Sequence, residues 1–434
     1  MDLQAAKETI YAAEFRRALQ HSNQPIWLKM LRENAFEYFT ENGFPTVKNE
    51  AWKYTNVAPI SQEDFSFDAG IIDAENLKKF TYAESNGSQL VCVDGKLNRE
   101  SSVLPQDLTL LSFDEAFQNE KFAQIIKEKL AKAIAYDSNG FTALNTAFLE
   151  NGTFLYLPKE AKIDAPVHLL YVSTENKASF PRVLIVAESF AEATIIESYT
   201  RAAETKYLTN AVVEIFLADE AKLKHFRVQR ESHEAFHTGA TAAEINRGSV
   251  YDSTNINLGG KLSRHDIRVR FNAEAGEAFV DGLYMLNENQ HHDTHSIIDH
   301  ALPNCNSHQN YKGVLNDKSR GVFNGIVFVR ENASGTDAKQ SNKNLLLSND
   351  ARIDTKPQLE IFNDDVKCAH GATVGQLEEE ELFYLLSRGL SENMARNLLT
   401  YGFAEEIINK IEIESIKKEL DEAVLNRLNV NLGT

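Results

Sequence analysis

The feature that most constrains the fold is a series of short β-type runs that repeats along the middle of the chain. From about residue 153 to 374, runs such as TFLYL, RVLIVA, KLKHFRV and GVFNGIVFV are separated by small turns such as AESFAEA, LADEAKL and LNDKSRG. The copies recur at intervals of roughly 30 residues, with irregular gaps, and such a period indicates a solenoid. A β-sandwich would also use many short strands, but hairpin dipeptides are scarce, so the pattern favours a parallel β-helix.

The segments on either side of this region have helical periodicity. Apolar residues recur at helical spacing from Ile26 to Phe39, and Gly43 and Pro45 follow where that helix should stop. Near the other end, LEEEELFYLLSRG predicts a helix that ends at Gly389, and Ser391 can cap a second helix. We therefore predict three domains: a mainly helical one at 1–150, a β-helix at 151–374 and a helical one at 375–434.

The composition is that of a soluble globular protein and excludes several function classes. The 434 residues carry a formal net charge of −18, which argues against a nucleic-acid or anionic-membrane partner. No apolar run approaches the roughly 18–20 residues that would cross a bilayer, and the first residues do not resemble a signal peptide. Three widely spaced cysteines form no disulfide framework, which indicates a reducing cytoplasm.

The common nucleotide and hydrolase motifs are missing from the sequence. There is no G-x-x-x-x-G-K-[ST], no G-x-G-x-x-G after a strand and no G-x-S-x-G. The stretch NLGGK has neither the spacing nor the hydroxyl residue of a phosphate loop, so we interpret it as a turn. If nucleotide hydrolysis is involved, another chain must supply it.

A histidine-rich stretch at 289–315 is the first candidate site. It holds five of the chain's twelve histidines, and on a strand His291, Asp293 and His295 would project to one face. Histidine with carboxylate can bind zinc or iron, although a tight spacing such as H-E-x-x-H is missing. The alternative is that these side chains, including His300 and His308, form metal-free polar ladders between neighbouring coils.

The stretch DDVKCAHGAT is the second candidate. If it is extended, Val366, Cys368 and His370 share one face, and a charged histidine beside the thiol would lower the thiol pKa. No oxyanion hole or third orienting group can be identified, so a hydrolase is weakly supported. The alternative is a buried cysteine beside a histidine bonded to backbone. Cys92 lies in an apolar run and is expected in the core.

Three long stretches carry a specific resemblance. HHDTHSIIDHALPNCNSHQNYKGVLNDKSRGVFNGIVFV, TDAKQSNKNLLLSNDARIDTKPQLEIFNDDVKCAHGATVGQ and LFYLLSRGL closely resemble the SufB/SufD family of iron–sulfur cluster assembly proteins, and NEAWKYTN resembles an N-terminal element of that family. The resemblance spans essentially the whole chain. It implies a right-handed parallel β-helix between two helical domains. It also implies a complex with the paralogous scaffold SufB and the ABC-type ATPase SufC, and homodimers when the chain is alone.

The resemblance also implies roles for particular residues. The family's functional histidine falls in K-C-x-H-G-A-T and maps onto His370, with Cys368 beside it, at an interface where a cluster forms; transient iron binding by His370 is part of this role. Its SufB partner cysteine would lie in LLLSNDARIDTKP, where this chain has none, which is the pattern of SufD rather than SufB members. The family's SufC-docking module maps onto Leu382, Phe383, Leu386, Met394, Leu398, Tyr401 and Phe403.

The leading functional prediction is a non-catalytic scaffold subunit for iron–sulfur cluster assembly, without a tightly bound cofactor of its own. A transient cluster and reduced flavin are expected only in the complex. Two alternatives stay open: a stand-alone metal-dependent enzyme that uses the stretch from His291 to His308, and a purely structural β-solenoid adaptor. In the first, His291 and His295 would be metal ligands.

Overall fold

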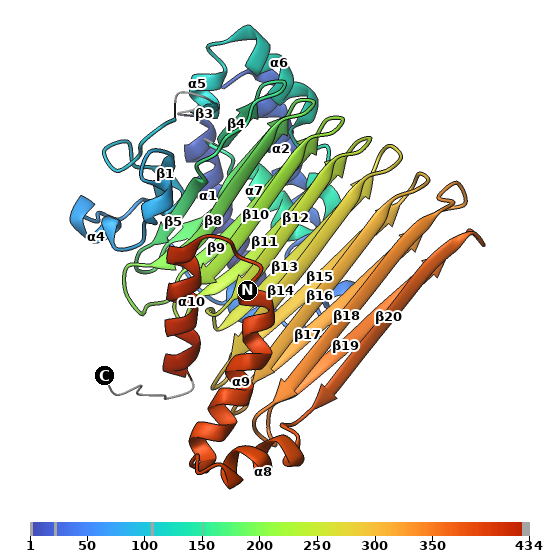
Figure 1. The fold of residues 1–434 in the computed structure, drawn as a ribbon. Coiled ribbons are helices and arrows are strands. Elements are labelled where there is room, and N and C mark those ends of the chain that lie inside the picture. The colour runs from blue at the N-terminus through green and yellow to red at the C-terminus, as the bar shows by residue number, and fades with distance from the viewer. Residues whose placement is uncertain (1–2, 21–23, 106–107, 151, 428–434) are drawn as a thin grey trace.

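A parallel β-solenoid dominates the molecule, with helices packed outside it (Figure 1). The structure is a computed structural model that describes residues 3–20, 24–105, 108–150 and 152–427. The solenoid strands are β4 (Thr153–Leu157), β5 (Val167–Ser173), β6 (Ala178–Ser179), β7 (Arg182–Ala187), β8 (Glu192–Arg201), β9 (Leu208–Leu217), β10 (Lys222–Arg230), β11 (Phe236–Ile245), β12 (Val250–Asn257), β13 (Leu262–Phe271), β14 (Glu277–Leu286), β15 (His291–His300), β16 (Asn306–Leu315), β17 (Arg320–Val329), β18 (Thr336–Leu346), β19 (Arg352–Ile361) and β20 (Val366–Gly375).

Helices and short strands flank this stack. Those before it are α1 (Leu3–Gln20), α2 (Ile26–Asn42), η1 (Glu50–Trp52), α3 (Ala58–Ser61), α4 (Ala74–Lys78), η2 (Ala83–Ser85), β1 (Gln89–Val93), β2 (Lys96–Leu97), β3 (Thr109–Ser112), α5 (Phe113–Ala116), α6 (Glu120–Lys129), η3 (Tyr136–Ser138) and α7 (Gly140–Ala147). Those after it are α8 (Glu379–Ser387), α9 (Glu392–Ile408) and α10 (Glu414–Arg427). The element type therefore changes close to the predicted boundaries, while the division into three domains stays a prediction.

Two parallel sheets face each other across the core, and consecutive long strands alternate between them. One sheet runs β2-β1-β5-β8-β10-β12-β14-β16-β18-β20, and the other runs β19-β17-β15-β13-β11-β9-β7-β4-β3. Leu262 pairs with His291 and His291 with Arg320, so each of these coils takes 29 residues. The sequence prediction of a parallel β-helix built on a repeat of this length is confirmed.

The recurring turns reverse the chain through a left-handed residue. Phe190, Glu220 and Asp317 have φ of 62°, 62° and 53°, and they occupy the predicted turns AESFAEA, LADEAKL and LNDKSRG. Gly248 takes the equivalent place in a further turn, with φ of 63°. A left-handed backbone conformation is costly for most residues with a side chain. Small residues beside it avoid further crowding, which explains why the turns repeatedly contain small residues.

Apolar layers outside the solenoid hold the flanking helices in place. Ile407 of α9 and Ile416 of α10 are buried against Phe226 and Leu283, which project from the outer face of the β5–β20 sheet. On the other sheet, the buried Trp52 ring lies under the guanidinium of Arg264, with its carbon 3.8 Å from the ring centroid. Through this contact the motif NEAWKYTN fastens the N-terminal region to the solenoid.

Local helix signals behave as the sequence indicates. Gly43 has φ of 64° and follows α2, and Gly389 has φ of 94° and follows α8. The Ser391 side chain accepts a hydrogen bond from the backbone N–H of Met394, which confirms the predicted cap of α9. Within the described residues, no helix combines the length and apolar character needed to cross a membrane.

Candidate functional site

Cys368 and His370 lie on β20, the last strand of the solenoid. Among the described strands, β20 pairs only with β18 and β19 only with β17, so the final coil presents two open strand edges at one end of the stack (Figure 1). Cys368 is opposite Ala338 and His370 is opposite Gln340 in the register of the sheet. We call Cys368 and His370 the rim pair, because they sit on the exposed rim of the solenoid.

The two members of the rim pair differ in exposure. Val366 and Cys368 are half-buried and pack against the apolar group around Val327 and Val329, whereas His370 is exposed. Their i, i+2 spacing on a strand places both side chains on one face, as predicted. The packing of Cys368 with Val327 and Val329 directs that face toward the space between the sheets. The side-chain carbonyl of Gln340, the residue next to His370 in the ladder, is buried without a hydrogen-bond partner.

The Cys368 thiol is not activated in the isolated chain. Burial raises its pKa, and the carboxylate of Asp337 raises the pKa further, while a backbone hydrogen bond at Ala338 opposes both effects. This direction is opposite to the lowered thiol pKa considered from the sequence. The main physical cause of the raised pKa is burial of the thiol among its apolar neighbours.

His291, Asp293 and His295 do project to one face of β15, as predicted. Thr55 Oγ1 lies 2.9 Å from His291 Nε2 and donates to Asp293 Oδ2 at 2.5 Å, and Arg264 Nη1 donates to the same oxygen at 2.8 Å. His295 Nε2 lies 3.1 Å from Asp293 Oδ1. Asp293 is thus surrounded by protein groups; burial raises its pKa, but Arg264, His295 and Thr55 together lower it.

Neighbouring histidines in this stretch also have protein partners. His292 Nδ1 lies 2.7 Å from Ser263 Oγ, His300 Nε2 lies 2.8 Å from Ser307 Oγ, and the His308 ring stacks on Phe279. Across the described part of the chain, no group of three or more His, Cys, Asp or Glu side chains is placed to hold a metal ion. The geometry supports the polar ladders between coils, and a metal role for His291 and His295 stays a prediction without support here.

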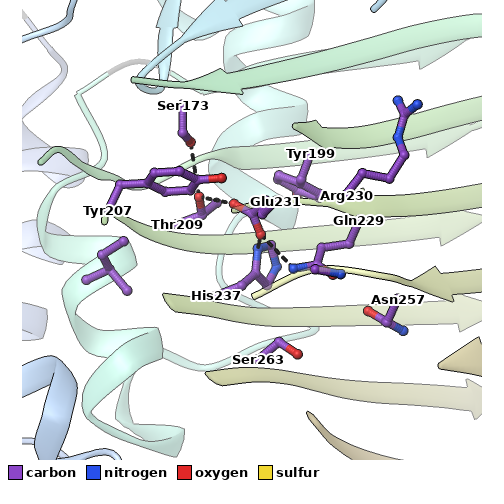
Figure 2. Close-up of polar contacts among 12 residues, drawn as sticks. Ser173, Tyr199, Tyr207, Thr209, Gln229, Arg230, Glu231, His237, Asn257 and Ser263 are labelled. Atoms are coloured by element: carbon purple, nitrogen blue, oxygen red, sulfur yellow. Dashed lines mark hydrogen bonds and ion pairs between the residues drawn. The ribbon is translucent and has the colours of Figure 1, made fainter. Parts of the chain in front are cut away.

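A buried polar cluster inside the solenoid was missed from the sequence. Glu231 accepts hydrogen bonds from Thr209 at 2.6 Å and from Gln229 at 2.9 Å, and its Oε2 atom lies 2.7 Å from His237 Nδ1 (Figure 2). Arg227 Nη2 lies 2.6 Å from His237 Nε2 and closes the set. We call these five residues the interior cluster.

The interior cluster is sealed from solvent. Glu231 and His237 are each 1% exposed. Burial opposes ionisation of Glu231, but His237, Thr209 and Gln229 together lower its pKa, whereas burial lowers the pKa of His237 itself. A substrate has no open approach to these atoms, so we interpret the cluster as a polar part of the core.

A signal for this cluster was present in the sequence. In KLKHFRVQRE, the residues His225, Arg227, Gln229 and Glu231 alternate with apolar or outward residues, so they share one face of a predicted strand. Because the intervening Phe226 and Val228 are also buried, under the C-terminal helices, both faces of β10 are covered. The alternation alone therefore could not show which face of β10 points into the space between the two sheets.

The predicted docking residues on α8 and α9 divide into two groups. Four of them are exposed and form an apolar face that no described residue covers: Phe383, Leu386, Met394 and Leu398. Leu382 is half-buried. The other two point inward: Tyr401 donates a hydrogen bond to Asp421 at 3.0 Å, and Phe403 packs against the solenoid beneath Lys312.

The fold and the rim together define a class: a parallel β-solenoid with one open end and a separate apolar helical face. Comparison with known families agrees. The family model described as "SUF system FeS cluster assembly, SufBD core domain" matches residues 170–403, and the model "SufBD protein N-terminal region" matches residues 5–169. The chain belongs to the SufBD family of the SUF iron–sulfur cluster assembly system.

Similar proteins come from several bacteria. An iron–sulfur cluster assembly SufBD family protein of Synechocystis is 34% identical over 98% of this chain and 94% of that protein. The iron–sulfur cluster assembly protein SufD of Escherichia coli is 31% identical over 89% of this chain and 90% of its own length. SufD of Bacillus subtilis is 28% identical over 94% of this chain and 95% of its own length. The predicted resemblance to SufD members is thereby confirmed.

Proposed function

We propose that this chain is the SufD-type scaffold subunit of a cytoplasmic SufBCD complex. The observation that carries the proposal is the open final coil, in which His370 is exposed on a strand that has no neighbour on one side. A histidine in this position can bind iron or manage protons only once another surface completes the site. The iron–sulfur cluster is then a product that passes through the interface, and the chain needs no tightly bound cofactor.

The open end supports pairing with the paralogous scaffold SufB. Both β19 and β20 present unpaired backbone N–H and C=O groups, which are templates for strand addition. Ile361, Phe362 and Val374 are exposed apolar side chains on or beside these strands. The same end would allow a homodimer when SufB is absent, with Cys368 and His370 near the shared surface.

The exposed apolar face of α8 and α9 supports docking of the ATPase SufC. Phe383 and Met394 are more than half exposed, and exposed aromatic and methionine side chains are enriched at interfaces. The four glutamates from Glu378 to Glu381 precede this face. Their charge suits a basic surface on the partner. ATP hydrolysis belongs to SufC in this proposal, so the chain itself is a non-catalytic subunit; reduced flavin in the complex stays a prediction.

The test is to co-purify the chain with SufB and SufC and to follow cluster formation by absorption spectroscopy. His370→Ala should leave folding and complex formation intact, because the side chain is exposed, but should abolish the iron–sulfur chromophore. His308→Ala is the matched control, since it removes a half-exposed histidine from another strand of the same sheet. Normal cluster yield from His370→Ala would contradict the assigned role and favour a purely structural adaptor.

A further inference from the structure

A column of amide side chains runs inside the solenoid and ends one coil before His370. In the register of the β5–β20 sheet, Gln309 on β16 is opposite Gln340 on β18, and Gln340 is opposite His370 on β20. Gln309 and Gln340 are buried, at 2% and 3% exposed, and we call them the amide ladder. The amide ladder therefore leads from the core of the solenoid to the rim pair.

The amide ladder has a definite polarity. Gln340 Nε2 donates to Gln309 Oε1 at 2.8 Å, and Gln309 Nε2 donates to Ser296 Oγ on β15, also at 2.8 Å. Gln309 thus presents its carbonyl oxygen to a donor that lies one coil further along the stack. If this step is repeated once, the carbonyl oxygen of Gln340 meets a donor on His370.

The carbonyl oxygen of Gln340 is an unfilled acceptor. Gln340 Oε1 is buried and has no hydrogen-bond partner in the described part of the chain. Because it is covered, bulk water does not satisfy it, and a buried acceptor without a donor is costly. The oxygen therefore calls for a donor from a neighbouring side chain of the chain itself.

The positions that face Gln340 on the other sheet carry no side-chain donor. A Cβ added to Gly325 on β17 would come within 2.5 Å of Gln340 Nε2 and 2.9 Å of the Phe323 ring, so the missing side chain leaves room for the amide. Pro357 on β19 is opposite Gly325 in the register and has no polar side-chain atom either. In the adjoining coil, His370 is the donor that this column provides.

Strand spacing puts the imidazole of His370 within reach of this oxygen. Neighbouring strands lie about 4.8 Å apart, and residues opposite each other in a parallel pair project to the same face of the sheet. A histidine that binds a metal usually donates its second ring N–H to a carbonyl or carboxylate oxygen, which fixes the tautomer and the orientation of the ring. Gln340 Oε1 is an oxygen of this kind.

We propose that Gln340 is the positioning residue of His370. Its carbonyl oxygen accepts a hydrogen bond from one ring nitrogen and leaves the other nitrogen unprotonated at the open end, where it can bind iron. Gln309 holds the Gln340 amide by its nitrogen, so the amide cannot turn over and offer a donor instead. This inference rests on the proposed function, in which iron is the cargo that His370 binds during cluster assembly.

The first test observes His370 in the full chain without partners or iron. The histidine rings are labelled with ¹⁵N and ¹³C, the signals of His370 are assigned by their loss in His370→Gln, and spectra are recorded at about pH 8, where an ordinary imidazole is neutral. Wild type should show one dominant tautomer of His370 and a ring N–H proton that is protected from exchange with water. Gln340→Leu should populate both tautomers and lose the protected proton.

Two further variants separate positioning from stability. Asn344→Leu removes another buried amide from β18, which contacts Tyr284, Asn342 and Thr373, so it should leave the ring spectrum of His370 unchanged. Gln340→Glu keeps an acceptor oxygen and should retain the protected proton. If Gln340→Leu does not fold, the presence or absence of the protected proton in wild type decides the matter.

The second test follows cluster formation in the complex with SufB and SufC. Gln340→Leu should assemble with both partners but slow the appearance of the chromophore roughly tenfold or more, as loss of an outer partner of a metal-binding histidine does. Gln340→Glu should stay closer to wild type.

The two tests fail separately. Absence of the protected proton in wild type, or an unchanged ring spectrum in folded Gln340→Leu, would overturn the hydrogen bond. A changed spectrum with normal cluster formation would overturn the positioning role. Normal cluster formation in His370→Ala would instead remove the proposed function of His370, whereas the ring spectrum would still decide the hydrogen bond to Gln340.

Discussion

The interior cluster and the rim pair place similar chemistry in opposite settings. His237 of the interior cluster is 1% exposed and contacts Glu231 and Arg227, whereas His370 is exposed on the last strand. The strand that carries the interior histidine, β11, pairs with β9 on one side and with β13 on the other. His370 has a coil on one side only. The difference teaches that, in a solenoid, position along the stack decides whether a histidine stabilises the fold or remains available to another molecule.

The largest expected effect comes from breaking the interior cluster. Glu231→Ala leaves His237, Thr209 and Gln229 without their shared acceptor, so we expect a loss of about 3–5 kcal/mol in the free energy of unfolding. Urea unfolding measures it. Glu234→Ala, which removes an exposed carboxylate nearby, should change the free energy by less than about 0.5 kcal/mol. A loss below 1 kcal/mol in Glu231→Ala would show that the cluster is not a sealed part of the core.

The second prediction concerns pH. Burial lowers the pKa of His168 to about 3 and of His300 to about 4, below the ordinary value near 6.5. From pH 7 to pH 5 the unfolded chain binds protons at these positions and the folded chain does not, so the free energy of unfolding falls. The two residues together should account for about 4 kcal/mol of that loss.

Urea midpoints at pH 7, 6 and 5 in phosphate-free buffers measure the loss. His300→Gln keeps a hydrogen-bonding side chain but does not titrate, so it should remove about half of the part that we assign to the two histidines. An unchanged pH dependence in this variant would mean that His300 becomes protonated in the folded state, and that its burial is less complete than the structure indicates.

The smallest of the three expected effects lies on the helical face. Under the proposed docking of SufC, Phe383→Ala should weaken that binding by about 2 kcal/mol, roughly 30-fold, because Phe383, at 72% exposed, is the most exposed side chain of the apolar face. The unfolding temperature of the Phe383→Ala variant should stay unchanged. Phe403→Ala should lower the unfolding temperature and leave SufC binding unchanged, because Phe403 packs inside the chain. Calorimetric titration with SufC separates the two, and equal binding of wild type and Phe383→Ala would move the docking site elsewhere.

Much of the architecture could be predicted because the local signals are strong. The turn composition reflects a left-handed residue such as Glu220, and the shared face of Cys368 and His370 follows from strand geometry. Strands whose inward side chains are polar were harder to predict from the sequence. VYDSTNIN forms β12, yet its inward residues Ser253 and Asn255 are polar, so they do not give the apolar alternation that marks a strand.

Tertiary packing explains the remaining misses. Met394, Leu398 and Tyr401 share a helical face by spacing, but spacing does not show where that face begins to meet the solenoid. Only the position of α9 across the sheet turns Tyr401 inward while leaving Leu398 exposed. Likewise, Arg230 and Tyr82 are 148 positions apart in the sequence, and no local pattern could predict that they meet.

The asymmetry of the stack limits how many copies can join. One end exposes two long strands, while the other finishes in the short antiparallel strands β2 and β3 beside the N-terminal helices. A solenoid that is adhesive at both ends would grow into a fibre. In the described part of the chain the long open strands lie at one end, so joining two chains through that end would cover them and stop growth at the pair. Under the proposed function, that single junction is where a cluster would be built.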